Sequence, residues 1–308
     1  MKKYTCKRIL MMIPVLIGVI FIVFVLLELA PGEPVTMLLG ENPNPEDAAR
    51  LREELGLNRP FLIRFADYVK NIFLHFDFGN SYQTGRSVLE ACLERYPTTL
   101  TLAILGTAMI FLIGLPFGII SALKRYTVVD AVCSTFAMIG AAMPRFWLGL
   151  LFIIAFSLNL KWFPASGFTT PKQWVLPALT IGIGGCASFL RTTRSSLLDV
   201  IRQDYIRTAR AKGQSEGKIV THHMLRNALL PMITVIGIEF GQMLGGAMVT
   251  EVVFSIPGLS NFIIANIRAR DYPVVLGGVL LIAFCYSVLN LIVDILYAFA
   301  DPRVKASM

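Results

Sequence analysis

Six long apolar runs constrain this 308-residue chain more than any other feature of its sequence. A run of about 18 or more apolar residues is long enough to cross a bilayer as an α-helix. Hydrophobic residues make up 55% of the chain and charged residues only 16%, which argues against a soluble protein of this length. We therefore expect an all-α integral membrane protein with about six transmembrane helices. The runs are Ile9–Ala30, Leu100–Leu123, Ala131–Leu158, Leu176–Leu190, Leu229–Phe254 and Val274–Phe299.

Two of these runs need comment. The fourth is short before Arg191, but Leu176–Ser196 would still span about 31 Å at about 1.5 Å per residue. The first follows four basic residues, as a secretory signal peptide does. It is longer than the apolar part of a cleaved signal, which is about 7–15 residues, so we expect an uncleaved span.

The net charge of +8 is distributed as a membrane topology rather than as a nucleic-acid surface. Basic residues concentrate before the first run, in residues 124–130, in residues 191–226 and in the C-terminal tail. Short loops rich in Lys and Arg stay in the cytoplasm, so we expect both termini to be cytoplasmic and no nucleic acid to bind. The five cysteines fall singly in different segments, which predicts neither a disulfide nor a metal site.

Residues 31–95 are predicted to form a helical extracytoplasmic cap. Asn44-Pro45 and two acidic residues have the pattern of a helix N-terminus, and Gly56 is expected to end that helix. A second helix is expected to open at Pro60. Its apolar stripe, expected to serve packing, consists of Phe61, Phe65, Val69, Ile72 and Phe76. The other segments are residues 1–30, the transmembrane domain 96–297 with a cytoplasmic loop at 195–230, and a cytoplasmic tail at 298–308.

Several charged or helix-breaking residues lie inside the predicted spans, where an isolated charge is costly and either pairs or faces water. Pro144 is expected to kink the third span and favour a cavity. An ion pair between Arg145 and Glu239 and a role in a pathway are both open. Glycines spaced four apart, such as Gly114 and Gly118 or Gly237, Gly241 and Gly245, are expected to pack helices closely. The pathway candidates are Pro144, Arg145, Glu239, Glu251, Pro257 and Gly258.

The basic loop between the fourth and fifth spans is the least membrane-like part of the chain. Its helix-forming residues run from Ser195 to Lys212, break at Gly213 and Gly217, and resume from Lys218 to Leu230. This pattern predicts two helices that form a protruding elbow, which could lie on anionic lipid or enter a groove of a partner protein. The lack of a broad apolar face favours the protein groove. The nearby GQSEGK lacks the spacing and the Ser or Thr of a phosphate-binding loop.

The elbow also carries a family resemblance. Thr208–Gly213, followed by Leu225–Pro231, resembles the cytoplasmic loop of ABC importer permeases, in particular the first permease of the dipeptide, oligopeptide and nickel class. Matching motifs extend over nearly the whole chain, at Ala30–Pro34, Asp77–Ser81, Met143–Gly149, Thr250–Leu259, Arg270–Pro273 and Asp301–Arg303. The sequence departs from the pattern at Arg207-Thr208-Ala209, where the family's loop begins Glu-Ala-Ala, and at Ile256 and Ser260.

The resemblance implies the type I ABC importer transmembrane fold in the cell (inner) membrane of a prokaryote. It implies a second permease subunit, two ABC ATPase subunits that bind ATP and magnesium, an extracytoplasmic solute-binding protein and surrounding membrane lipids. This chain itself would bind no cofactor or metal and would have no catalytic residue. The implied ATPase-coupling residues are Arg207, Thr208, Ala209, Arg210, Ala211, Lys212 and Gly213.

The cargo stays open among dipeptides, oligopeptides, glutathione and nickel, free or chelated. A secondary transporter or channel that is not driven by ATP is the alternative, and it predicts repeated halves and ion-binding acids within the spans. A membrane-embedded enzyme comes third, because the sequence has no HExxH or GxSxG motif.

Overall fold

The structure is a computed structural model that describes residues 2–40 and 43–300. Its regular elements are helices joined by loops, and it divides into two compact units, each described here by itself. One unit comprises residues 2–99 and 257–288, and the other comprises residues 100–256 and 289–300 among those described. Residues 301–308, which include the Asp301–Arg303 motif and most of the predicted tail, lie outside the described residues.

The first unit combines the N-terminal helix, the cap and two long-helix segments. Its elements are α1 (Lys2–Leu29), α2 (Pro34–Leu39), α3 (Pro45–Glu54), α4 (Phe61–Lys70), the π-helical η1 (Asn71–His75), the start of α5 (Val88–Leu123), α13 (Leu259–Arg268) and the first part of α14 (Tyr272–Ala300). The expected cap of α3 is confirmed, because the Asn44 side chain accepts a hydrogen bond from the Glu46 N–H at 3.2 Å.

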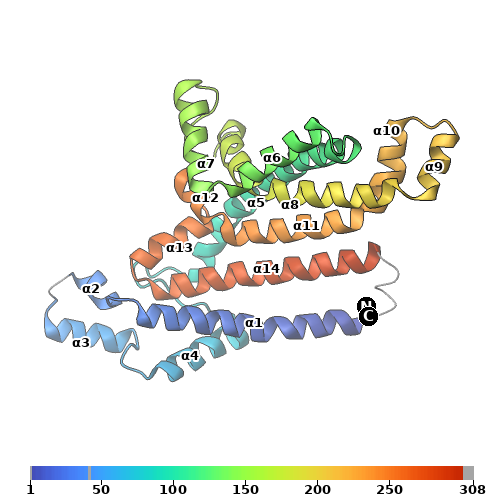
Figure 1. Ribbon diagram of the computed structural model, residues 1–308. Helices are drawn as coiled ribbons and strands as arrows, with labels where there is room; N and C mark the ends of the chain where they lie inside the picture. The colour runs from blue at the N-terminus through green and yellow to red at the C-terminus, as the bar shows by residue number, and fades with distance from the viewer. Residues whose placement is uncertain (1, 41–42, 301–308) are drawn as a thin grey trace. The chain divides into compact units, whose positions relative to one another are not determined.

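The second unit contains the remaining spans and the basic loop. Its elements are the rest of α5, α6 (Val128–Ala142), α7 (Arg145–Phe152), η2 (Ile153–Asn159), α8 (Pro171–Ile201), α9 (Asp204–Ala211), α10 (Glu216–Lys218), η3 (Ile219–Met224), α11 (Leu225–Gly246), α12 (Met248–Val253) and the end of α14. Helix α8 packs along both α6 and α11, and α9 and α10 lie beyond the ends of α8 and α11 (Figure 1).

Within the described residues, five helices are long and apolar enough to cross a membrane, and a bent pair adds a sixth when it is counted as one broken span. The bent pair is Val128–Ala142 and Arg145–Asn159, which meet at 105°. The sequence causes this break. Proline disfavours helical backbone in the residue before it, and Met143 is extended (φ −75°, ψ 130°). The predicted kink at Pro144 is therefore confirmed. The fifth span ends at Gly246 rather than at Phe254, and α12 is a separate helix.

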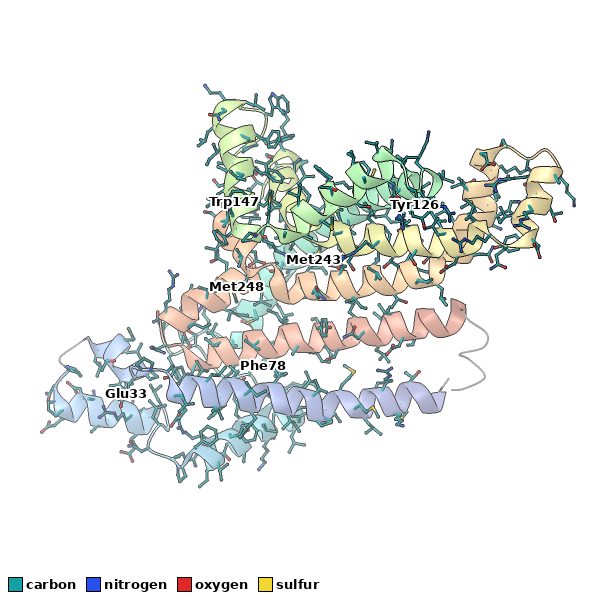
Figure 2. The ribbon with its side chains drawn as sticks, in the orientation of Figure 1. Glu33, Phe78, Tyr126, Trp147, Met243 and Met248 are labelled. Carbon is teal, nitrogen blue, oxygen red and sulfur yellow. The ribbon has the colours of Figure 1, made fainter. Side chains whose placement is uncertain are left out.

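Large apolar side chains cover the outer faces of the helices (Figure 2). Leu26, Phe136 and Ile154 are 60%, 54% and 49% exposed, which suits helices surrounded by lipid rather than by water. Inside the second unit, Gly118 allows a close approach, since a Cβ there would lie 2.6 Å from Thr193 Cβ. Among the described residues of this chain, Gly245 has no neighbour within 4 Å of such a Cβ, so the close packing predicted for it does not form within the chain.

The stripe on α4 packs mainly against α1, as expected. The rings of Phe21 and Phe65 are 5.3 Å apart, and those of Phe24 and Phe61 are 5.4 Å apart, both edge to face. Phe76 is the exception and that part of the prediction is wrong. The chain passes through the π-helical turn η1 before it, so Phe76 takes a left-handed backbone (φ 54°) and is 77% exposed.

Candidate functional site

The basic elbow begins where α8 ends. Helix α8 runs to Ile201, the chain breaks at Arg202-Gln203, and α9 occupies Asp204–Ala211. The prediction of one helix from Ser195 to Lys212 is therefore wrong. Gly213 ends the helical region, as expected, with a positive φ of 74° that an L side chain rarely adopts. Gly217 lies inside α10, so the second predicted break is also wrong.

The elbow is held together by its own contacts. Arg210 donates from Nε to Glu216 at 2.7 Å, and His223 Nε2 lies 2.8 Å from Gln214 Oε1. Ile206 and Ala209 are buried in the same apolar cluster as Met224. Ala209 therefore packs inward, where a small side chain fits against the cluster.

The outer surface of α9 is polar and free for contact. Arg207 keeps 76% of its side chain exposed and lies 3.9 Å from Asp204, whose side chain is 98% exposed, so this surface ion pair contributes little. Thr208, Ala211 and Lys212 are exposed beside it. The implied coupling residues thus have different roles. Ala209 packs inward, Gly213 provides the positive φ that ends the helix, and Arg210 pairs within the elbow. The other four residues face outward.

Arg145 lies at the first position of α7, directly after the break in the third span. Its Nη1 points to the Gly246 carbonyl at 3.4 Å, which is a long hydrogen bond. Two glycines make room for the guanidinium. A Cβ on Gly246 would lie 3.0 Å from Nη1, and a Cβ on Gly184 would lie 3.4 Å from Nε.

Glu239 is 8% exposed in α11 and faces the next glycine of α8. A Cβ on Gly185 would lie 2.7 Å from its Oε2. Arg145 and Glu239 form no ion pair within 4.0 Å in the described part of the chain. The structure therefore does not form the direct bridge that the sequence left open. The two charges approach α8 at adjacent glycines, each from a different helix.

The motif around Glu251 packs against the motif around Arg145. A Cβ on Gly149 would lie 3.2 Å from both Phe254 and Val253, so only glycine allows α7 and α12 to meet this closely. Glu251 is completely buried, so its side chain packs inside the protein rather than facing the membrane surface. Pro257 and Gly258 connect α12 to α13, and Gly258 is the N-cap residue of α13.

Sequence reasoning missed a buried carboxylate that joins three of the family motifs. Asp271 is completely buried and accepts hydrogen bonds from Ser81 Oγ at 2.6 Å, the Tyr82 N–H at 3.1 Å and the Gln83 N–H at 3.3 Å. The neighbouring Arg270 donates to the Pro31 carbonyl. We call these contacts the Asp271 clasp. The separation of about 190 residues between its halves left no local signal to find it by.

Sequence reasoning also missed a contact that holds the loop before α6 in place. Arg194 binds Asp130 through two parallel hydrogen bonds, Nε at 2.9 Å and Nη2 at 2.8 Å. The Ser121 hydroxyl and the Tyr126 N–H also donate to this carboxylate. A bidentate arginine pair of this kind fixes geometry as well as charge, so it sets the approach of α6 to α8.

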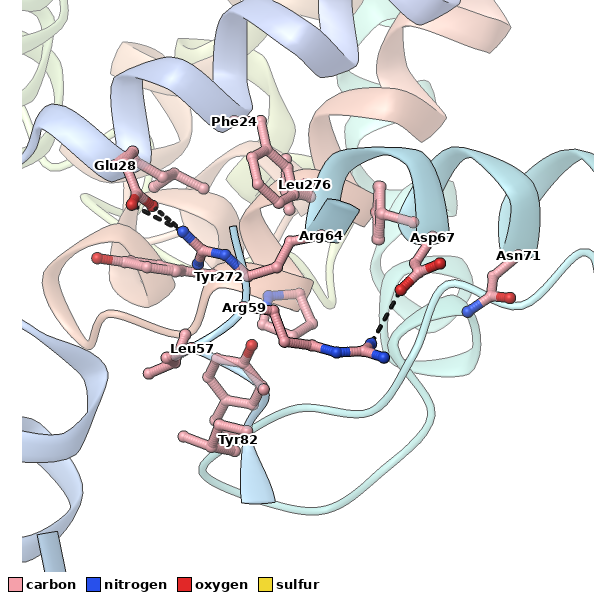
Figure 3. Close-up of a pocket in the computed structure, with 15 residues that line it drawn as sticks. Phe24, Glu28, Leu57, Arg59, Arg64, Asp67, Asn71, Tyr82, Tyr272 and Leu276 are labelled. Atoms are coloured by element: carbon pink, nitrogen blue, oxygen red, sulfur yellow. Dashed lines mark hydrogen bonds and ion pairs between the residues drawn. The ribbon is translucent and has the colours of Figure 1, made fainter. Parts of the chain in front are cut away.

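A pocket of about 210 Å³ is lined by residues of the cap, the end of α1 and the start of α14 (Figure 3). Arg64 pairs with Glu28 at 2.7 Å, and Arg59 pairs with Asp67 at 2.9 Å, so its charged side chains balance. Burial, and after it the Asp271 carboxylate, raise the pKa of Tyr82 to about 12. The pocket is thus lined by neutral phenol, apolar side chains and paired charges.

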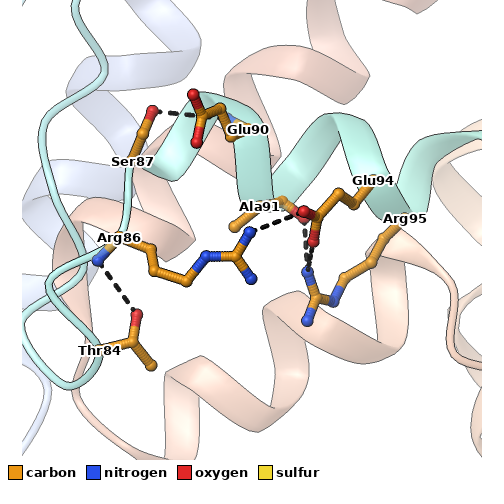
Figure 4. A network of polar contacts seen from close by, with 7 residues as sticks. All are labelled: Thr84, Arg86, Ser87, Glu90, Ala91, Glu94 and Arg95. Carbon is orange, nitrogen blue, oxygen red and sulfur yellow. Dashed lines mark hydrogen bonds and ion pairs between the residues drawn. The ribbon is translucent and has the colours of Figure 1, made fainter.

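A polar network fixes the start of α5 (Figure 4). Glu94 accepts from Arg86 at 2.6 Å and lies 3.6 Å from Arg95. Arg95 also donates to the Ala91 carbonyl at 2.7 Å, and its guanidinium lies 3.9 Å from the centre of the Phe262 ring. These contacts tie α5 to α13 within the first unit.

These observations define a class of protein. It is a multi-pass helical membrane protein with charged side chains beside a broken span, and its basic loop forms a separate elbow. Two family models match the chain. One describes a binding-protein-dependent transport system inner membrane component and covers residues 114–306, and the other describes its N-terminal part and covers residues 1–103. The chain belongs to this family of inner membrane components. It is therefore a multi-pass inner membrane protein of a prokaryote and the permease subunit of an ABC importer, as predicted.

Several named relatives align with this chain over nearly its whole length. A putative peptide transport system permease of Brucella abortus (strain 2308) is 39% identical over 97% of this chain and 98% of its own length. The oligopeptide transport system permease AppB of Bacillus subtilis is 38% identical over 99% and 100%. The glutathione transport system permease GsiC of Salmonella choleraesuis is 39% identical over 99% of each.

The fold is shared with solved ABC transporters. A chain of the MetNI methionine ABC transporter in an inward-facing conformation matches 69% of this chain and 97% of its own, with a TM-score of 0.56 at 17% identity. This confirms the predicted type I ABC importer fold.

Proposed function

We propose that this permease pairs with a second, similar permease and that the two enclose a pathway for small peptides. The relatives named above support this cargo, since their names include peptides, oligopeptides and glutathione, which is itself a tripeptide. Small peptides are zwitterions at neutral pH. Arg145 and Glu239 supply one cation and one carboxyl group near the break in the third span, and the two side chains form no direct ion pair within 4.0 Å.

The orientation follows the charge. The elbow and the loop before α6 are basic and are placed in the cytoplasm with both termini, and the cap is placed outside. The solute-binding protein would dock on the cap. The pocket in Figure 3 offers it tyrosine and arginine side chains, which are frequent anchors of protein interfaces.

The ATPase subunits would dock on the outward residues of α9, and they alone would bind ATP and magnesium. The observation that carries this proposal is the division of α9 into two sides. Ile206 and Ala209 join it to the core of the second unit, while Arg207, Ala211 and Lys212 stay exposed. A partner that moves the outer side therefore also moves the helices packed on the inner side.

Closure of the ATPase pair on ATP would displace α9 and tilt α8 and α11 as packed bodies, which switches the pathway between inward and outward access. Coupling requires that the ATPases and the loaded binding protein bind the two states with different affinity. Pro144, Glu251, Pro257 and Gly258 would contribute as break points and connections along this pathway.

Reconstitution tests the proposal. The chain, its second permease and the cognate ATPases are placed in vesicles with the solute-binding protein, and uptake of a radiolabelled dipeptide and of glutathione is followed. We expect uptake that requires ATP, the ATPases and the binding protein together. Uptake along a gradient without the ATPases would support the secondary transporter or channel instead.

A further inference from the structure

A groove of about 360 Å³ lies between α6 and α8, outside the sites described above. Its residues recur at three- and four-residue steps, so each helix contributes a single face. The lining residues are Ser134, Ala137 and Met138 of α6 and Ala187, Leu190, Arg191 and Arg194 of α8. Ala137, Ala187 and Leu190 form a buried apolar floor, and Met138 is 53% exposed at the rim. The groove is therefore apolar along its length and cationic at one end.

The cationic end lies at the depth of lipid headgroups. Trp174 stands in the first turn of α8, as aromatic residues do at a membrane interface. Arg191 and Arg194 follow it by 17 and 20 residues, which is about 26 and 30 Å along a helix. The hydrocarbon core of a bilayer is about 30 Å thick. If Trp174 lies at one interface, the two arginines reach the other.

The guanidinium groups at this end have unused hydrogen-bond donors. Arg191 is exposed, and across the described residues it makes no ion pair and no side-chain hydrogen bond. Arg194 uses Nε and Nη2 on Asp130, which leaves Nη1 for another acceptor. The adjoining loop adds Lys124 and Arg125. Residues 121–134 and 187–194 together thus contain four basic residues and one acidic residue.

We infer that the groove between α6 and α8 binds a phospholipid with an anionic headgroup. The phosphate bridges Arg191 and the Nη1 of Arg194, and one acyl chain lies on the apolar floor. An apolar floor continuous with the cations favours a lipid over free phosphate, and the excess of positive charge favours an anionic over a zwitterionic headgroup. With the orientation proposed above, the lipid belongs to the cytoplasmic leaflet, but its binding does not depend on transport.

The test uses the complete transporter, stripped of lipid in detergent and titrated with phosphatidylglycerol or with phosphatidylcholine of the same acyl chains. Native mass spectrometry gives the apparent dissociation constant of the first bound lipid. We expect phosphatidylglycerol to bind more tightly. Arg191→Gln should weaken its binding about fivefold, the effect of one basic side chain near an anionic headgroup. It should weaken phosphatidylcholine less, because that lipid shares the phosphate but carries no net charge. Ser134→Leu fills the groove without altering charge and should weaken both lipids.

Arg202→Gln is the matched control, because Arg202 is exposed at the end of the same helix beyond the groove. Equal effects of Arg191→Gln and Arg202→Gln would overturn the inference. Displacement of the lipid by millimolar inorganic phosphate would also overturn it, in favour of a phosphate site. Cross-linking of a Met138→Cys variant to another subunit in high yield would assign the groove to a protein interface. None of these measurements needs ATP or cargo, so they are independent of the proposed transport.

Discussion

Removal of the Asp271 carboxylate should lower the stability of the first unit, and it changes none of the candidate pathway residues. Asp271→Ala leaves the buried Ser81 hydroxyl and two part-buried backbone N–H groups without their acceptor. A hydrogen bond to a charged group contributes about 1.5–3 kcal/mol. Three donors share one carboxylate, and the cost of burying that charge offsets part of their sum, so we expect a loss of about 3 kcal/mol. Ser81→Ala removes one donor and should cost about 1–2 kcal/mol.

Asp77→Asn is the control for the Asp271 variants. Asp77 accepts a hydrogen bond from the Gly79 N–H at 2.8 Å in the same loop but is exposed, so its change should stay within about 0.5 kcal/mol. The assay is thermal unfolding of the purified transporter, combined with hydrogen exchange of the amides of Tyr82 and Gln83. We expect faster exchange in the Asp271→Ala variant at these amides and unchanged exchange in α8. Equal unfolding midpoints for Asp271→Ala and Asp77→Asn would refute the clasp.

Three further predictions concern the second unit. Arg207→Glu should reduce ATP-driven peptide uptake at least tenfold with unchanged thermal stability. The control Lys218→Glu, a charge reversal beyond α9, should leave uptake within twofold. Equal losses of uptake in the two variants would argue against α9 as the docking surface. Gly185→Ala should lower the unfolding midpoint in a thermal scan by an amount that corresponds to about 1–3 kcal/mol, because the added Cβ overlaps the Glu239 carboxyl. Arg145→Leu and Glu239→Gln should have additive effects on stability, since the two side chains form no ion pair; a coupling above about 1 kcal/mol in a double-mutant cycle would show that they do.

Local signals allowed the sequence to predict many of the elements. Proline restricts the backbone of the residue before it, which is why the break at Pro144 could be placed to the residue. The Asn44 cap and the end of the elbow helix at Gly213 depend on neighbouring residues in the same way. Each of these features is decided within about four residues, which a single sequence records.

Features decided by distant residues could not be predicted. The break at Arg202-Gln203 has no proline or glycine to mark it, and it lets Ile206 and Ala209 turn back onto the core. The bond between Asp130 and Arg194 joins residues 64 apart. A buried ion pair and an exposed charge look alike in a sequence, because only the packing of two helices distinguishes them.

The packing of the elbow also decides how force could pass through the proposed transporter. Ile206 and Ala209 of α9 belong to one cluster with Leu197 near the end of α8 and Met224 before α11. That cluster continues to Phe189 and Met243, near the residues that accommodate Arg145 and Glu239. Close-packed interiors resist compression, so a displacement of α9 is not absorbed where the chain bends at Arg202-Gln203. It is passed to α8 and α11 together, and these two helices carry the glycines beside the Arg145 and Glu239 side chains. A partner that grips only the outer side of α9 can therefore change the surroundings of Arg145 and Glu239 without contacting either.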